Sequence, residues 1–486
     1  MSPFKKLASQ TAIYGLPTIV GRLLNYLLVP IYTRTFSTAQ YGTVNEMYAY
    51  VSFLLIVLTY GMETSLFNFS RNNENKEKVY STILLTIILT SSFFILGTWL
   101  FAQPIADLIN YPNHTEYIIY FGWILGLDAI SSIAFAKLRE QQKAGLFAGI
   151  KILNIAANIF FNLFFIVYCP KLLAQNPQSW LLKFYDPQVG VGYVFVSNLI
   201  SSIITILIQL PFILRVKFTF DFSQLKTILK YSSPLLLAGL AGMTNETIDR
   251  ILLKYLLPEN SALEQVGIYG ACYKISLIMT IFIQTFRFAA EPFFFSHSDK
   301  QDAKQVYARV MKYFVIICSI IFLGTMINLS WIQGFIGKDF RSGLQVVPLL
   351  LMANFFLGVF FNLSIWYKLT NQTRYGAWLT IFGAVITLAG NFIFIPRFGY
   401  MACAYTTLVC YLLMMLVSYF IGNKHYNVNY DVKRIVAYIG LSLFLFAISQ
   451  YINFDSDVLG ITIKNLLLIL FALVVFLFER KEFRFQ

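Results

Sequence analysis

The chain has 486 residues, of which 58% are hydrophobic and only 12% are charged. Soluble domains carry about 25% charged residues, so this composition excludes a soluble globular protein and indicates a chain embedded in a membrane throughout. The formal net charge is +14, but in a membrane protein the placement of lysine and arginine matters more than their sum. The five cysteines lie in or beside apolar runs without metal-ligand spacing, so we expect buried thiols and no metal site.

Apolar runs near 20 residues, the length that crosses a bilayer as a helix, occur about fourteen times. We therefore predict an all-α, polytopic membrane protein with about fourteen transmembrane helices. The first apolar run follows Lys5 and Lys6. It contains Arg22 and Asn25 and lacks a small-residue cleavage site, so we interpret it as a helix that stays attached. The predicted spans are 11–33, 42–66, 79–102, 117–136, 145–168, 190–213, 232–256, 265–289, 308–332, 343–366, 375–396, 399–421, 434–453 and 459–478.

The loops between these spans alternate in charge. With the N-terminus inside, most lysines and arginines fall in loops on the inner side, as the positive-inside rule requires. Both termini are then cytoplasmic. The outer loops are short, and the longest, near 170–189, could not house a catalytic domain. We therefore expect no enzyme activity and no cofactor.

The first half of the sequence repeats in the second. AQYGTVNEMYAY (39–50) resembles EQVGIYGACYKI (264–275), and NLFFI (162–166) matches NFIFI (391–395). Each half then holds six spans, an even number, so the halves share one orientation and their pseudo-twofold axis runs along the membrane normal. We predict a six-helix bundle in residues 1–225, a second in 226–425, and two additional transmembrane helices in 426–486.

The span 232–256 carries the strongest polar signal. Asn245, Glu246, Asp249 and Arg250 lie near its middle, where a charge facing lipid costs roughly 2.5–3.5 kcal/mol. Glu246 and Arg250 are four residues apart and suit an intrahelical pair, whereas Asp249 is free to serve another partner. Two interpretations stay open: a self-neutralised structural pair, or side chains that line a cavity.

Carboxylates at depth are candidates for ion coupling. Asp128 lies at mid-depth of its span, where it either pairs with Arg22 or carries a proton or sodium ion. Glu63 lies near the inner end of its span and is either solvated or involved in coupling. Asp249 completes the coupling candidates.

Two further spans carry polar faces. Lys151, Asn154, Asn158 and Asn162 share one face of the span 145–168, where the asparagines bind either sugar hydroxyls or neighbouring helices. In the span 265–289, Gln284 and Arg287 lie on one side with Glu291, and Lys274 lies near the outer end. Arg287 and Glu291 are four residues apart, so local pairing competes with a ligand role.

The cations on these faces outnumber the acids. A cavity with surplus positive charge attracts an anion, and arginine suits phosphate because it binds bidentately. The abundant Asn, Gln, Thr and Tyr side chains suit a cargo rich in hydroxyl groups. No P-loop, HExxH or Ser/His/Asp pattern occurs in the sequence.

Residues 22–50, 127–144 and 245–258 resemble the polysaccharide-biosynthesis, O-antigen-flippase (Wzx-type) family of the multidrug/oligosaccharidyl-lipid/polysaccharide (MOP) exporter superfamily. The resemblance implies a MATE-like, alternating-access transporter of undecaprenyl-diphosphate-linked oligosaccharides in the bacterial inner membrane. It implies a monomer that meets membrane lipids and polysaccharide polymerase or assembly proteins, and no nucleic acid. By position, the residues that would meet the diphosphate are Arg22, Arg250, Lys274 and Arg287. The polar substrate-binding candidates are Asn25, Asn154, Asn158, Asn245 and Gln284.

Other functions fit the sequence less well. The lipid II flippase branch clusters several arginines in its first half, whereas this chain has Arg22 and Lys151 at depth there. A cation-coupled multidrug exporter of the same fold commonly uses an acidic site in the first helix, where this chain has Arg22. A membrane-embedded polymerase or glycosyltransferase would need a sizeable outer loop.

Overall fold

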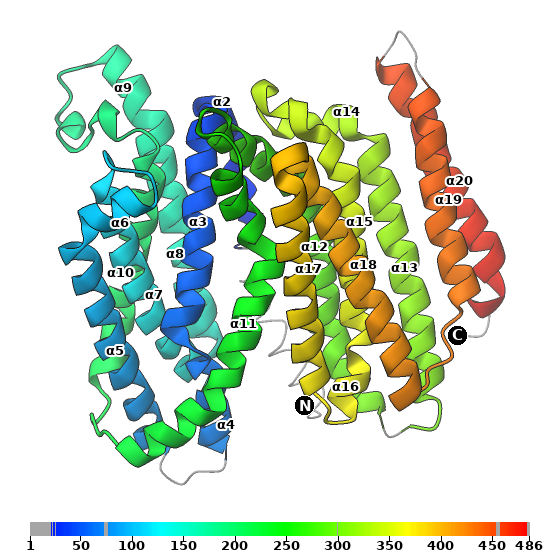
Figure 1. Ribbon diagram of the computed structural model, residues 1–486, viewed down its shortest axis with the longest axis horizontal. Helices are drawn as coiled ribbons and strands as arrows, with labels where there is room; N and C mark the ends of the chain where they lie inside the picture. The colour runs from blue at the N-terminus through cyan, green and yellow to red at the C-terminus, as the bar shows by residue number, and fades with distance from the viewer. Residues whose placement is uncertain are drawn as a thin grey trace. The chain divides into compact units, whose positions relative to one another are not determined.

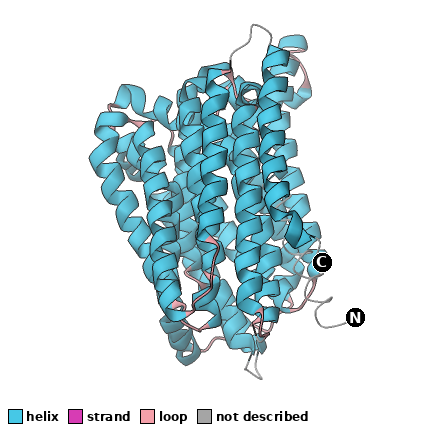
Figure 2. Cartoon of the chain, turned by 90° about the vertical axis from the view of Figure 1, so that its right-hand side faces the viewer, coloured by secondary structure: helices cyan, strands magenta, loops and turns pink. Residues whose placement is uncertain are grey.

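The computed structural model describes residues 21, 23–24, 26–71, 76–298, 300–452 and 457–483. Every regular element in these ranges is a helix, mostly α-helical with short 3-10 and π segments (Figures 1 and 2). Helices suit an apolar chain in a bilayer because they satisfy their backbone hydrogen bonds internally. The predicted all-α fold is confirmed.

Twelve described helical stretches are long and apolar enough to cross a membrane, and each corresponds to one predicted span. Of the other two predicted spans, about half of 11–33 lies outside the described residues. The span 232–256 lies within α11 (Phe222–Leu256), which is long enough to cross but carries polar and charged side chains in its second half. The predicted count of about fourteen therefore agrees with the helices that the structure describes.

The chain divides into two compact units, and the first comprises Met1–Lys254. Its described elements are α2 (Val29–Thr35), α3 (Thr38–Thr59), α4 (Met62–Arg71), α5 (Lys76–Leu100), α6 (Ala102–Leu108), α7 (Thr115–Glu140), α8 (Ala144–Asn162), the π segment η1 (Leu163–Tyr168), α9 (Cys169–Gln175), η2 (Trp180–Phe184), η3 (Pro187–Val189), α10 (Gly192–Leu214) and most of α11.

The predicted span 42–66 is two helices, α3 and α4. A capping box between Ser37 and Gln40 starts α3. The helix ends at Thr59, and the next two residues, Tyr60 and Gly61, have positive φ angles, 29° and 74°. A Cβ on Gly61 would lie 3.1 Å from Cβ of Leu235 in α11, so glycine provides both the left-handed turn and the close approach of that helix. The break re-aims α4, which carries Glu63.

Helix α7 is the centre of the first unit, because it packs against α5, α10 and α3. Two of its glycines make the contact with α5 close. A Cβ on Gly122 would meet Thr98, and one on Gly126 would meet Ile95, each nearer than 3.0 Å. Small residues of this kind let two membrane helices pack with their backbones near each other. Asp128 is therefore held on a helix that is fixed by its neighbours on several sides.

The second unit comprises Tyr255–Gln486. Its described elements are α12 (Glu259–His297), α13 (Ala303–Ile327), α14 (Leu329–Ile332), η4 (Gln333–Phe335), η5 (Lys338–Val346), α15 (Val347–Leu363), α16 (Ile365–Leu369), α17 (Arg374–Phe398), α18 (Tyr400–His425), α19 (Val432–Tyr451) and α20 (Asp457–Phe483).

The two units use the same order of helix packing. In the first, α10 packs against α7 and α8, and in the second, α18 packs against α15 and α17. These are the sixth, fourth and fifth spans of each predicted half, so the internal repeat seen in the sequence extends to the neighbours of the sixth span. Superposition of the halves about a membrane-normal axis stays a prediction.

The compact units divide at a different residue from the predicted domains 1–225, 226–425 and 426–486, which stay a prediction based on the repeat. Helix α11 contributes Leu225 and Ile228 to the hydrophobic core around α4, α5 and α7. Its middle approaches Gly61 closely. These contacts join most of α11 to the first unit.

A buried ionic cluster fastens α19 and α20 to α13. Glu479 of α20 is fully buried, and its carboxylate lies 2.5 Å from Nζ of Lys312 in α13. The hydroxyl of Tyr438 in α19 donates to the same carboxylate at 2.6 Å. Because a charge buried at this depth needs a partner, the three helices are joined by more than apolar packing.

Candidate functional site

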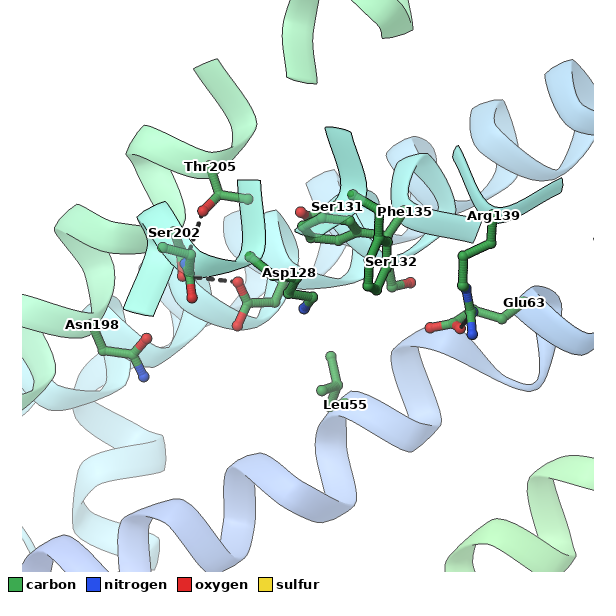
Figure 3. Close-up of a pocket in the computed structure, with 13 residues that line it drawn as sticks. Leu55, Glu63, Asp128, Ser131, Ser132, Phe135, Arg139, Asn198, Ser202 and Thr205 are labelled. Carbon is green, nitrogen blue, oxygen red and sulfur yellow. Dashed lines mark hydrogen bonds and ion pairs between the residues drawn. The ribbon is translucent and has the colours of Figure 1, made fainter. Parts of the chain in front are cut away.

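A cavity of about 310 Å³ lies within the first unit (Figure 3). Its lining comes from α3, α4, α7, α8 and α10. The polar residues that line it are Glu63, Asp128, Ser131, Ser132, Arg139, Lys151, Asn154, Asn198, Ser202 and Thr205. The cavity therefore combines both signs of charge with amide and hydroxyl groups.

Asp128 contributes a carboxylate from the middle of α7. The hydroxyl of Ser202 in α10 donates to its Oδ1 at 2.8 Å (Figure 3). The predicted partner Arg22 lies outside the described residues, so the predicted pair stays a prediction. Asn198, one turn before Ser202, lines the same cavity and donates to the hydroxyl of Tyr48 at 3.0 Å.

Lys151 places a cation in the cavity from α8. Its ammonium nitrogen lies 4.2 Å from the centre of the Phe135 ring, a cation–π contact. Among the described residues, no carboxylate lies within ion-pair distance of this ammonium group. Asp128 and Glu63 line the same cavity and offset part of this charge from a greater distance, and the ammonium group can still meet a ligand that carries a negative group.

The asparagines on one face of α8 bond to neighbouring helices, and Asn154 also lines the cavity. Asn154 lines the cavity, and its amide donates to Oγ1 of Thr205 at 2.8 Å. Asn162 instead accepts a hydrogen bond from the hydroxyl of Tyr32 at 2.7 Å and donates to the backbone oxygen of Asn158 at 2.8 Å. Of the two roles left open for these asparagines, contact with a neighbouring helix holds for Asn154, which bonds to α10, and for Asn162, which bonds to α2.

Glu63 and Arg139 form an ion pair at one end of the cavity. Nη2 of Arg139 lies 2.6 Å from Oε2 of Glu63 (Figure 3). Both side chains are partly exposed, and the guanidinium group also lies over the ring of Phe67. The break between α3 and α4 aims Glu63 toward α7 and so makes this pair possible.

The charged residues of α11 pair differently from the prediction. Nη1 of Arg250 lies 3.5 Å from the Asp249 carboxylate and donates to the backbone oxygen, not the carboxylate, of Glu246. The Glu246 side chain is exposed. The predicted Glu246–Arg250 pair is therefore wrong, and so is the prediction that Asp249 is free of Arg250. The short Asp249 side chain bends back to accept the backbone N–H of Arg250 at 2.8 Å, which brings the two charges together. Asn245 is buried on the same helix.

Sequence reasoning missed a buried ion pair between α3 and α11. Nζ of Lys254 lies 2.8 Å from the Glu46 carboxylate, which is 0% exposed, and donates to the backbone oxygen of Ile109 at 2.6 Å. The hydroxyl of Tyr111 donates to the same carboxylate at 2.6 Å. Lys254 lies one helical turn after Arg250. Its spacing from Arg250 and the presence of Glu46 inside an apolar run were the available signals.

The second unit holds the remaining predicted residues. Arg287 lies 3.7 Å from Glu291 on the next turn of α12, as the local-pairing interpretation predicted, and its guanidinium group lies over the ring of Phe361. Glu291 also binds Lys368 at 2.5 Å. Lys274 and Gln284 are half-buried on α12.

The predicted anion-binding residues thus belong to different parts of the chain. Arg250 is in the first unit, and Lys274 and Arg287 are in the second. Arg22 and Asn25 lie outside the described residues. Among the residues that the structure describes, no group of three His, Cys, Asp or Glu side chains could hold a metal ion.

Several solved structures of membrane transporters have the same fold as this chain. A structure described as lipid II flippase MurJ in an inward closed conformation matches with a TM-score of 0.76 at 14% identity, covering 97% of this chain and 99% of that one. An inward-facing multidrug-resistance MATE transporter of the MOP superfamily matches with a TM-score of 0.66 at 14% identity, covering 88% and 98%. The Vibrio cholerae MATE transporter VcmN, in its bent form, matches with a TM-score of 0.53 at 12% identity, covering 87% and 98%. The chain is therefore a multi-pass membrane protein with the fold of the MOP superfamily.

The family model described as "Polysaccharide biosynthesis protein" matches residues 7–298. The chain belongs to this family, which confirms the resemblance seen in its sequence. No curated protein matches the chain closely enough to compare.

Proposed function

We propose that the protein is a flippase that moves lipid-linked oligosaccharide units, carried on undecaprenyl diphosphate, across the bacterial inner membrane by alternating access. The observation that carries this proposal is the cavity of the first unit, inside a chain of the polysaccharide biosynthesis family. The proposal includes the orientation that follows from the positive-inside rule, with both termini in the cytoplasm.

The chemistry of the cavity suits a diphosphate sugar. An anion that enters would meet Lys151, whose charge has no carboxylate at ion-pair distance among the described side chains. In a partly dry site this attraction is stronger than in water. The hydroxyl and amide groups of Ser131, Ser132 and Asn198 can exchange hydrogen bonds with sugar hydroxyls.

The anion site predicted from the sequence, Arg22, Arg250, Lys274 and Arg287, stays part of the proposal, with Lys151 added to it. Arg250 and Arg287 each face a carboxylate, so each would bind an anion more weakly than an unpaired cation. Asn25, Asn158, Asn245 and Gln284 stay candidates for polar contacts, and polysaccharide polymerase or assembly proteins stay candidate partners.

A second candidate function is a cation-coupled exporter of small molecules. The observation that favours it is Asp128, a carboxylate inside the cavity that one serine hydroxyl satisfies only in part. A proton or sodium ion bound there would couple transport to an ion gradient. Asp249 and Glu63 remain coupling candidates, although each pairs with an arginine.

The test separates these functions. Cells that lack the gene should accumulate lipid-linked oligosaccharide on the cytoplasmic side, measured by extraction and mass spectrometry, and the wild-type gene should clear it. Lys151→Gln should reduce clearance by about tenfold at matched protein level, because a charge-assisted hydrogen bond contributes about 1.5–3 kcal/mol. Lys183→Gln, an exposed lysine outside the cavity, is the control and should clear normally.

Accumulation of lipid-linked units with unchanged drug sensitivity would support the flippase. Normal levels of these units together with a new sensitivity to cationic drugs would overturn it in favour of the exporter. Full clearance by Lys151→Gln, with the gene deletion still causing accumulation, would remove Lys151 from the site but keep the function.

A further inference from the structure

A second cavity of about 350 Å³ opens between α5, α7 and α10 of the first unit. This second cavity is separate from the first, and residues that line the two cavities are in contact. Ser131, which lines the first cavity, donates to Oε1 of Gln209 at 2.8 Å, and Gln209 lines the second. The proposed transport function does not use this second cavity.

The second cavity has a surplus of positive charge. Lys137 is neutralised, because its ammonium group lies 3.3 Å from Glu77 and 3.1 Å from Glu140. Lys143 and Arg215 also line the cavity. Both are exposed, and neither has an ion-pair partner within the part of the chain that the structure describes. Two cations therefore remain available at its mouth.

Gln209 provides an independent sign of a ligand. The residue is 0% exposed, and its amide nitrogen has no hydrogen-bond partner among the described residues. A buried N–H donor without an acceptor raises the free energy of the folded state. An oxygen that reaches into the cavity would satisfy this donor while its negative charge meets Lys143 and Arg215.

Apolar side chains lie beside the basic residues of this cavity and suit a ligand that also has apolar chains. Phe212 lines the cavity, and next along the chain Leu214 and Phe218 are large exposed apolar side chains. The basic residues lie at the end of α7 and α10 that the charge distribution predicts to be cytoplasmic, where anionic lipids attract lysine and arginine. A ligand with a charged head and apolar chains matches both features.

We infer that this cavity binds the phosphate group of an anionic phospholipid, with Lys143 and Arg215 at its mouth and the Gln209 amide within. The lipid lies against α7 and α10, the two helices that also carry Asp128 and Ser202. The inference stands whether or not the transported substrate is an oligosaccharide.

The test measures lipid retained by the purified full-length chain in detergent, by native mass spectrometry with phosphatidylglycerol or phosphatidylcholine added. Wild type should bind phosphatidylglycerol in preference. The double variant Lys143→Gln/Arg215→Gln should weaken phosphatidylglycerol binding by about tenfold, because it removes two charged contacts, and should leave phosphatidylcholine binding unchanged. The matched control is Lys171→Gln/Lys183→Gln, which removes two exposed lysines elsewhere in the same unit.

Ser131 donates to Gln209, so the glutamine is tested in a Ser131→Ala background, where Gln209→Met keeps the side-chain volume and removes the unpaired donor without leaving a hydroxyl unpaired. Compared with Ser131→Ala alone, the double variant should bind phosphatidylglycerol more weakly without a lower melting temperature of lipid-free protein, whereas a purely structural role of Gln209 would lower the melting temperature. Equal loss in the test and control doubles, or no loss in either, would overturn the inference. Displacement of phosphatidylglycerol by millimolar inorganic phosphate would assign the cavity to free phosphate and overturn the lipid assignment.

Discussion

Helices α7 and α15 are the fourth spans of their halves, and their interiors differ. At mid-helix, α7 places Asp128 beside a cavity that also holds Lys151. At mid-helix, α15 packs tightly: a Cβ on Gly358 would lie 2.7 Å from the ring of Phe314 and 2.9 Å from Ile283. Asn354, one turn earlier, is buried and donates to the Ser276 hydroxyl at 3.3 Å.

The ends of these helices are alike. Glu63 bridges to Arg139 near the end of the second and fourth spans of the first unit, and Glu291 bridges to Lys368 at the corresponding place in the second. The bridges and the packing order are thus common to both units, while the charged cavity belongs to α7 and its neighbours. A repeated frame thus carries different interiors in the two units, which supports the proposal that the polar part of a cargo binds in the first unit.

The largest expected effect comes from adding volume at the two interiors. Gly358→Val should destabilise the protein by about 3 kcal/mol, because the new side chain must displace a phenyl ring and an isoleucine in a filled core. Ser132→Leu adds a similar volume beside the cavity, where space is available, and should cost less than about 1 kcal/mol. Thermal unfolding of both purified variants in the same detergent measures the difference.

Equal destabilisation by Gly358→Val and Ser132→Leu would mean that the interior of the first unit is as closely packed as that of the second. Gly97→Val is a useful control, since a Cβ on that glycine meets nothing within 4 Å and the variant should behave like wild type.

A smaller effect is expected at a pair of asparagines that the repeat matches, Asn162 and Asn391. Asn162 accepts the hydroxyl of Tyr32, whereas Asn391 is 1% exposed and neither of its amide atoms has a partner among the described residues. Asn162→Leu should lower stability by about 1 kcal/mol, since it leaves a buried hydroxyl unpaired. Asn391→Leu should be neutral or stabilising, because it removes an unsatisfied polar group.

Melting temperatures of the two leucine variants decide this point. A Tyr32→Phe/Asn162→Leu double variant should recover part of the loss seen with Asn162→Leu alone. A loss at Asn391 as large as at Asn162 would show that the amide of Asn391 is satisfied in the folded protein.

The sequence predicted the fold well, because apolar runs near 20 residues leave the backbone little choice but to form helices. Twelve predicted spans appear among the described helices that are apolar enough to cross a membrane, and a further one, 232–256, lies within α11. The break at Tyr60 and Gly61 was not predicted, since a single glycine in an apolar run does not reveal a positive φ angle. Which helices pack against each other also could not be predicted, because packing depends on pairs of helices and the apolar pattern of one span does not identify its partner.

Less than half of the polar lining of the cavity could be predicted. Glu63, Asp128, Lys151 and Asn154 were found because polar groups inside apolar runs are conspicuous. Ser202 and Thr205 were not, because serine and threonine are common in membrane helices and bond to their own backbone. The predicted partner of Arg250, Glu246, was wrong. Helical spacing gives only the direction in which a side chain leaves the helix, whereas the short Asp249 side chain folds back toward its neighbour Arg250.

The smallest effect is expected at the loops that start α11 and α19. Asp221 accepts the backbone N–H of Gln224, and Asp431 accepts that of Arg434, so each carboxylate caps its helix. Asp221 also lies 2.8 Å from Lys78. The hydrogen bond from Lys78, with the cap bond from Gln224, lowers the pKa of Asp221 below its ordinary value of 3.8.

A lowered pKa means that the folded protein binds this proton less tightly than the unfolded chain does. The contribution of Asp221 to stability is then complete above its ordinary pKa and is lost as pH falls through the lower folded value. Asp221→Asn keeps a good helix cap and removes the charge. We expect it to lower the melting temperature slightly at pH 7, with the gap from wild type closing below about pH 4. Lys78→Gln should show the same small loss and the same pH dependence, because it removes the other partner of one contact. A gap that stays constant from pH 7 to pH 3, or that widens in acid, would show that the Lys78 contact contributes nothing to folding and that capping alone explains both loops.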